Sequence, residues 1–151
     1  AVLLADLAAK LGVDLCIEMG LWGFGLTTGK DYVALLKRIG RPNVRINFDA
    51  AATTLFNENA KPSKNDITVM APYLAHFHLC DRASTEPGKW DFRPIGEGVI
   101  DWDPLFHELN RVGYTGNVAV ELGWEVPPRT PEIVDDAVRR SIKYVEKYFA
   151  D

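Results

Sequence analysis

Short apolar runs alternate along the chain with longer segments in which apolar residues recur at helical spacing. The runs at 13–19, 44–49, 74–80 and 117–122 have the length and composition of β-strands. Helices are expected over 1–11 and 31–39, in a short segment ending at residue 73, around Pro104 up to Gly113, and from Pro131 onward. This alternation predicts an α/β fold in which a single domain, residues 1–151, is built on a parallel sheet.

The first and last helices carry regular apolar stripes, whereas one long segment carries no pattern. Leucines at positions 3, 4, 7 and 11 form the stripe of the first helix. The buried stripe expected on the last helix consists of Val134, Val138, Ile142, Val145 and Phe149. Residues 81–101 follow neither period, and we interpret them as a functional loop and a lid candidate.

Each predicted strand presents one acidic or imidazole side chain near its C-terminal end. These residues are Glu18, Asp49, His78 and Glu121. Side chains alternate between the two faces of a strand, and the face opposite these residues is entirely apolar: Leu15, Ile17, Ile46, Phe48, Phe77, Leu79, Val118, Val120 and Leu122. Such a pattern is typical of a parallel sheet that is covered by helices outside and partly polar inside.

Four βα units with polar residues at the strand C-termini predict a (β/α)₈ barrel, whose sites lie on that face. A complete barrel needs about 250 residues. The chain, which begins in a helix before its first strand, therefore looks like the C-terminal half of one.

Composition and charge narrow the function further. With 47% hydrophobic and 25% charged residues the chain is expected to fold, and its net charge of −4 disfavours nucleic acid as a partner. No apolar stretch of about 18 residues and no cationic segment before an apolar one occurs, so neither a membrane span nor a signal peptide is expected. Cys16 and Cys80 lie within strand candidates rather than in a spaced framework, which indicates reduced thiols and a cytoplasmic location.

The residue types at the strand ends suit metal-assisted proton transfer. Three carboxylates and one imidazole form a ligand set that fits one divalent ion such as Mn²⁺, Co²⁺ or Mg²⁺. A metal bound to a ketose would polarise its carbonyl and acidify the adjacent C–H. Glu18 and Glu121 could then remove a proton from one face of the substrate and return it to the other.

Three stretches, HFHLCD, PIGEGVIDW and GYTGNVAVEL, carry a resemblance to a known family. The chain resembles the sugar-phosphate isomerases and epimerases with xylose isomerase-like barrels, and among them most nearly the ketose 3-epimerases. The resemblance implies that Glu18, Asp49, His78 and Glu121 bind one divalent metal, that the two glutamates exchange the proton, and that the substrate is a keto-sugar or sugar phosphate. Two positions depart from the family pattern: Ala52 stands where many members have histidine, and Cys80 where many have lysine.

Five further residues are candidates for substrate binding: His76, Asp81, Arg82, Trp22 and Glu97. For several of them another role is open. His76 could be a hydrogen-bonded neighbour of the metal ligands, Asp81 could orient His78 or cap an element, and Glu97, between two glycines, could be a turn residue.

Two other functions remain open. The first is a metal-dependent dehydratase of the inosose or dehydroshikimate type, because inosose dehydratases share much of the pattern. The second is a truncated half-barrel without catalytic activity. A half-barrel has two open sheet edges, so we expect either a homo-oligomer or a complementing N-terminal half-barrel.

Overall fold

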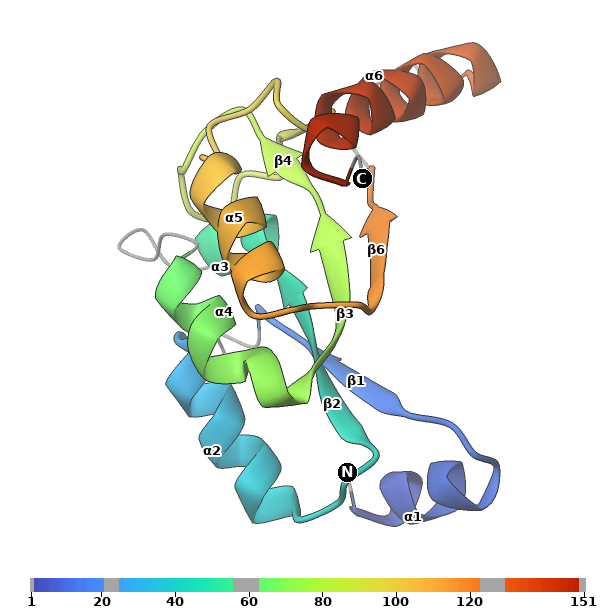
Figure 1. Ribbon diagram of the computed structural model, residues 1–151. Helices are drawn as coiled ribbons and strands as arrows, with labels where there is room; N and C mark the ends of the chain where they lie inside the picture. Colours follow the sequence, from blue (N-terminus) through green and yellow to red (C-terminus); the bar gives the residue numbers. More distant parts are fainter. Residues whose placement is uncertain (1, 21–24, 56–62, 123–129, 150–151) are drawn as a thin grey trace.

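A parallel sheet of four strands, in the order β1-β2-β3-β6, organises the computed structural model, which describes residues 2–20, 25–55, 63–122 and 130–149 (Figure 1). Its strands are β1 (Leu15–Glu18), β2 (Val44–Asp49), β3 (Leu74–Leu79) and β6 (Asn117–Val120). The helices are α1 (Val2–Lys10), α2 (Gly29–Ile39), α3 (Ala50–Leu55), α4 (Lys64–Met70), the 3₁₀ turn η2 (Ala71–Tyr73), α5 (Asp103–Arg111) and α6 (Pro131–Phe149). The predicted α/β half-barrel architecture and the place of each predicted strand are confirmed, with strand ends differing by one or two residues.

Strand register brings the C-terminal ends together. Asp49 pairs directly with His78, whereas Glu18 lies opposite Asn47, and Glu121 comes two residues after Ala119, the partner of His78. The backbone N–H of Glu121 still donates to the carbonyl of Leu79 at 2.8 Å, so this glutamate remains held at the sheet. The stagger is that of tilted barrel strands, and the longer glutamate side chains at the two outer strands span it.

The outer face of the sheet forms the core beneath α2, α4 and α5, which lie together along one side (Figure 1). Ile46, Phe48, Phe77 and Leu79 are fully buried there, as the alternation predicts. The rings of Phe48 and Phe77 stack with centroids 4.8 Å apart. On the edge strands the corresponding apolar residues are only partly buried against this core.

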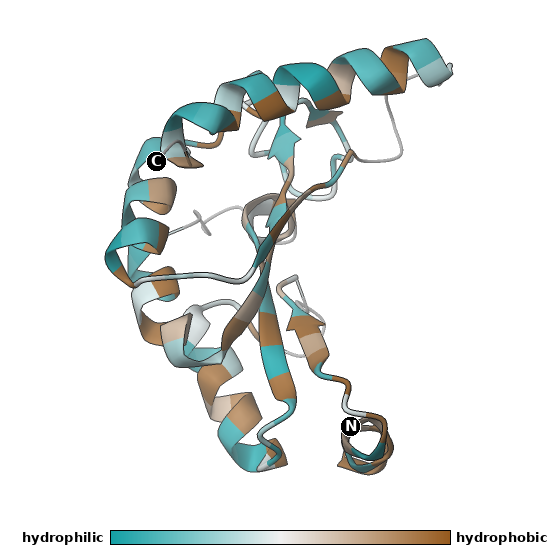
Figure 2. Ribbon diagram, turned by 45° about the vertical axis from the view of Figure 1, so that its right-hand side comes forward, coloured by the Kyte–Doolittle hydropathy of each residue, from teal (hydrophilic) through white to brown (hydrophobic). Residues whose placement is uncertain are grey.

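The apolar stripe of the first helix is exposed, and of the stripe expected to be buried on the last helix only Val145 is buried, which corrects most of the sequence interpretation. On α1 the buried residues are Ala5 and Ala8, while Leu3 is 86% exposed and Leu11, directly after the helix, is 72% exposed. On α6 the core contacts are made by Ala137, Ser141 and Val145, and Val134, Ile142 and Phe149 are exposed. Figure 2 shows these two helices at opposite ends of the molecule. A stripe is buried only where another element covers it.

Two further features were not predicted. The helix α3 follows β2 without a loop. The segment interpreted as a lid contains a two-stranded antiparallel sheet of β4 (Asp81–Arg82) and β5 (Phe92–Arg93). None of the helices in the described part of the chain has the length and apolar character needed to cross a membrane.

Candidate functional site

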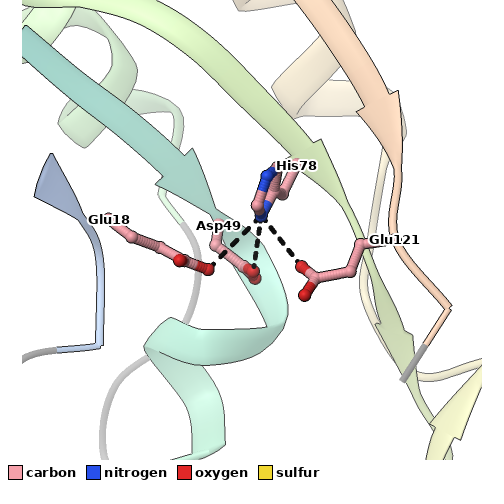
Figure 3. A group of neighbouring side chains, drawn as sticks. All are labelled: Glu18, Asp49, His78 and Glu121. Carbon is pink, nitrogen blue, oxygen red and sulfur yellow. Dashed lines mark ion pairs between the residues drawn. The ribbon is translucent and has the colours of Figure 1, made fainter. Parts of the chain in front are cut away.

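Four side chains from the ends of four neighbouring strands meet in one place. Glu18, Asp49, His78 and Glu121, which we call the strand-end cluster, each offer one ligand atom, and these atoms lie within 4.8 Å of one another (Figure 3). Two of the four, Glu18 and Glu121, stand at the outer strands β1 and β6 and point toward the central pair (Figure 3). The structure thus brings together the set that the strand pattern singled out.

The imidazole of His78 lies at the centre of this cluster. Its Nδ1 atom is 2.8 Å from Glu121 Oε2, 3.3 Å from Glu18 Oε1 and 3.6 Å from Asp49 Oδ2. Although it is buried, this nitrogen makes no hydrogen bond, because none of the three oxygens lies where the ring would donate. One nitrogen and three oxygens therefore converge without satisfying one another, which is the arrangement that a shared cation would complete.

The charges of the cluster also favour a bound cation. The surrounding carboxylates, Asp49 first among them, raise the pKa of His78 to about 11. Burial raises the pKa of Asp49 to about 6, and the imidazole lowers the pKa of Glu121. A single charge on His78 offsets only part of three negative charges, whereas a divalent ion held by the four donors would offset more. Three carboxylate oxygens and one imidazole nitrogen fit Mn²⁺, Co²⁺ or Mg²⁺.

The helix α3 orients the most buried member of the cluster, Asp49. Oδ1 of Asp49 accepts the backbone N–H of Ala52 at 2.8 Å, and the backbone carbonyl of Asp49 accepts the hydroxyl of Thr53 at 2.8 Å. With Oδ1 engaged at the helix start, it is Oδ2 that approaches His78. The position where a family histidine was expected, Ala52, thus contributes its backbone to the site.

A pocket of about 240 Å³ opens beside the cluster. Glu18, Asp49 and Glu121 form its polar side. The remainder of its lining consists of Gly20 and the apolar residues Met19, Ala52, Leu55, Trp90 and Phe92. Sequence reasoning missed Phe92 and Leu55. The signal for Phe92 was its spacing of two from Trp90 in an unpatterned segment, whereas Leu55 gave no signal.

Of the other residues predicted to bind substrate, one lies beside His78, one lies on the surface, and one is outside the described residues. His76 is half-buried on the inner face, and its ring meets that of His78 edge-on with centroids 5.1 Å apart. Glu97 is exposed, forms an ion pair with Arg140 of α6 and does not line the pocket, so its role in substrate binding stays a prediction. Trp22 lies outside the described residues.

Asp81 and Arg82 are fully buried and do not line the pocket, so their contact with substrate stays a prediction that the burial does not support. The carboxylate of Asp81 accepts five hydrogen bonds from the protein, and the guanidinium of Arg82 donates to Thr54 and to two backbone carbonyls. Both residues follow His78 closely in sequence, but they turn into the protein instead of the pocket.

A family model described as a xylose isomerase-like TIM barrel matches residues 3–148. The chain belongs to this family. Within the family it is similar to D-psicose 3-epimerase of Agrobacterium fabrum (strain C58), with 31% identity over 120 residues that make up 78% of this chain and 38% of that protein. It is also similar to ketose 3-epimerase of Arthrobacter globiformis, with 29% identity over 119 residues, 78% of this chain and 37% of that protein.

Among solved structures, the fold matches the crystal structure of the IOLI protein with a bound zinc atom. The TM-score is 0.78 at 21% identity, over 99% of this chain and 55% of that structure. The chain thus spans little more than a third of these two curated relatives of the xylose isomerase-like family and about half of a complete solved barrel.

Proposed function

We propose that this chain carries the metal-binding and proton-transfer residues of a ketose 3-epimerase. The observation that carries this proposal is the convergence of three carboxylates on a buried imidazole nitrogen that none of them satisfies. A divalent ion at the strand-end cluster would polarise the ketose carbonyl and lower the barrier to removing the adjacent proton. Similarity to two ketose 3-epimerases supports the substrate class.

Glu18 and Glu121 are the residues that move the proton in this proposal. They stand on the two outer strands, on either side of Asp49 and His78, and both carboxylates are partly exposed to the pocket. A substrate between them could lose its carbinol proton to one glutamate and receive a proton from the other on the opposite face, which inverts the carbon. Asp49 is too deeply buried to exchange protons in this way and serves as a ligand.

Within the keto-sugars, we favour an unphosphorylated substrate. Among the described residues that line the pocket none is lysine or arginine. The guanidinium of Arg82, the nearest basic candidate in the sequence pattern, is buried and already donates to the protein. A phosphate dianion would therefore meet carboxylates without a compensating side chain from this part of the pocket.

Metal binding is tested by calorimetry with Mn²⁺. Replacing His78 by alanine should weaken the affinity at least about tenfold, since even residues that only support a metal ligand have effects of that size. The control is His107→Ala, which removes an exposed imidazole of α5. Equal Mn²⁺ affinity in the wild-type and His78→Ala chains would show that the ligand set is wrong.

Proton transfer is tested by following exchange of the carbinol proton of a ketose with deuterated solvent. Glu18→Gln and Glu121→Gln should each abolish exchange, while Glu146→Gln, on the exposed side of α6, should leave it unchanged. Exchange that persists in either site variant would remove that glutamate from the proposal. An unsaturated product in place of an epimer would instead indicate the dehydratase chemistry.

We also propose that the activity needs further βα units, supplied by the same or another polypeptide. In the described sheet β1 and β6 each pair on one side only, and the helices beside them expose leucines on α1 and Val134, Ile142 and Phe149 on α6. Two copies closing on each other would bring six carboxylates into one barrel mouth, which favours a complementing half-barrel.

Light scattering at micromolar concentration tests whether the sheet edges are open. The 151-residue chain should self-associate, and a stable monomer would contradict the open-edge argument.

A further inference from the structure

The segment that borders the pocket is held in place by a buried arginine. Arg82 is fully buried, and its Nη1 atom donates to Thr54 Oγ1 at 3.0 Å. Its Nη2 atom donates to the backbone carbonyls of Glu86 and Lys89, each at 2.7 Å, and its Nε atom lies 3.5 Å from Asp91 Oδ1. One side chain thus ties three positions of the 86–91 segment to α3. A buried charge of this kind is tolerated because both Nη atoms donate hydrogen bonds and the carboxylate of Asp91 lies close to Nε, although Nε itself makes no hydrogen bond.

Backbone contacts reinforce the same connection. The N–H of Gly88 donates to the carbonyl of Leu55 at 2.7 Å, which joins the segment to the end of α3. Arg82 also pairs with Phe92 across the β4-β5 sheet. Because α3 begins directly after Asp49, the segment has a defined position relative to a member of the strand-end cluster.

Trp90 lies between two of the residues that Arg82 holds, Lys89 and Asp91. It borders the pocket together with Phe92, and the two ring centroids are 5.7 Å apart. Phe92 is only 8% exposed, whereas Trp90 is 41% exposed. Phe92 is therefore mostly covered by the protein, whereas the ring of Trp90 is the part of this aromatic pair that a ligand can contact.

We propose that Trp90 contacts the substrate, packing against the C–H face of a keto-sugar whose oxygens are turned toward the strand-end cluster, and that Arg82 positions Trp90. This inference rests on the proposed function, since it assigns the second wall of the same pocket. A sugar has one polar and one less polar side along its carbon chain, and an aromatic ring suits the latter. The pocket lining has carboxylates on one part and aromatic side chains on another, so its polar and apolar parts match the hydroxyl and C–H sides of a sugar.

The test compares two ketones in the presence of Mg²⁺. D-Fructose carries a carbon chain that Trp90 would cover, whereas dihydroxyacetone has the same ketone and neighbouring hydroxyl without that chain. Affinities are measured by saturation-transfer NMR titration of the full 151-residue chain. Trp90→Ala should weaken D-fructose binding about three- to tenfold, from the size of aromatic contacts, and leave dihydroxyacetone binding unchanged. Trp90→Phe should restore most of the D-fructose affinity.

Matched controls separate contact from general damage. Phe149→Ala removes an exposed aromatic of α6 that does not line the pocket and should change neither affinity. Mg²⁺ affinity, measured by calorimetry, should be the same in all variants, because neither Trp90 nor Arg82 belongs to the strand-end cluster.

The positioning role of Arg82 is tested by a double-mutant cycle. Arg82→Lys should weaken D-fructose binding on its own but add little in the Trp90→Ala background, because both changes remove the same contact. Thr54→Val, with Thr54→Ser as its control, removes one acceptor while leaving the arginine in place, and should show the same pattern if Arg82→Lys does not fold.

The possible outcomes distinguish failure of the Trp90 contact from failure of the proposed function. If the wild-type chain does not bind Mg²⁺, the metal site of the proposed function and this inference both fail. If it binds Mg²⁺ but neither ketone, this inference fails and the metal site of the proposed function stands. If it binds both, but Trp90→Ala affects them equally or not at all, the proposed function stands and the Trp90 contact is wrong. If the Arg82 and Trp90 effects add fully, Trp90 contacts substrate but Arg82 does not position it.

Discussion

Replacing Asp81 by asparagine should destabilise the fold without altering the metal site. Oδ1 of Asp81 accepts the backbone N–H groups of Arg82 at 2.8 Å and Ile100 at 3.2 Å. Oδ2 accepts those of Gly96 at 3.0 Å and Gly98 at 3.2 Å, and the indole N–H of Trp102 at 3.0 Å. Gly98 approaches so closely that a Cβ there would overlap the carboxylate.

Asparagine keeps one oxygen and replaces the other by an amide N–H₂ group, so in either orientation at least two buried donors face another donor. At about 1–3 kcal/mol for each unsatisfied group, the loss should be about 2–6 kcal/mol. Urea unfolding followed by tryptophan fluorescence measures it. The control is Asp135→Asn, which breaks an exposed pair with Arg139 and should cost at most about 1 kcal/mol.

Calorimetry of the folded variant completes the test, because Mn²⁺ affinity should stay near the wild-type value. A loss of stability below about 1 kcal/mol would refute the reasoning, since it would mean that the five hydrogen bonds contribute almost nothing. Weakened sugar binding at unchanged stability would restore the substrate contact that the sequence alone suggested for Asp81.

Three further predictions concern the packing around the site. Phe77→Ala, which empties a fully buried position stacked on Phe48, should cost about 3–5 kcal/mol in urea unfolding. Ser141→Ala removes the acceptor of the Ile95 N–H at 3.1 Å, which should cost about 1–3 kcal/mol and lower Tm in thermal unfolding. Hydrogen bonds from Arg111 and Thr68 lower the pKa of Glu108 from 4.5 to about 2, so its stabilisation is present above the unfolded-state value and lost as pH falls through the folded-state value. Unfolding free energies of the wild type and Glu108→Gln, measured across acidic pH, should therefore differ most near neutrality and converge toward about pH 2.

The strand-end cluster could be predicted because it depends on a local rule. Alternation along a strand determines which side chains share a face, and a parallel sheet places equivalent ends together. The same rule identified the buried face of β2 and β3, where Phe48 and Phe77 pack beneath the helices. No contact distant in sequence had to be guessed.

Other features depended on partners that a local pattern does not contain. The helix α3, with the sequence AAATTL, has no polar face to set against an apolar one, so it gave no periodic signal. The stripes of α1 and α6 were identified as stripes, but burial requires a covering element, and the described chain provides none for Leu3 or Ile142. The roles of Asp81 and Arg82 arise from groups between 4 and 28 residues away, apart from one bond between the two neighbours.

The stretch from His78 to Arg82 combines the site and the structure that surrounds it. His78 points into the cluster, whereas three and four residues later Asp81 and Arg82 point into the protein and organise different parts of the following segment. Asp81 holds the turn at 96–102, and Arg82 holds residues 86–91 beside the pocket. Substitutions at either position would reduce activity and so resemble losses of catalytic groups. The proposals differ in what else should change: loss of a strand-end cluster residue should weaken metal binding, loss of Asp81 should weaken the fold, and loss of Arg82 should weaken binding of substrates long enough to reach Trp90.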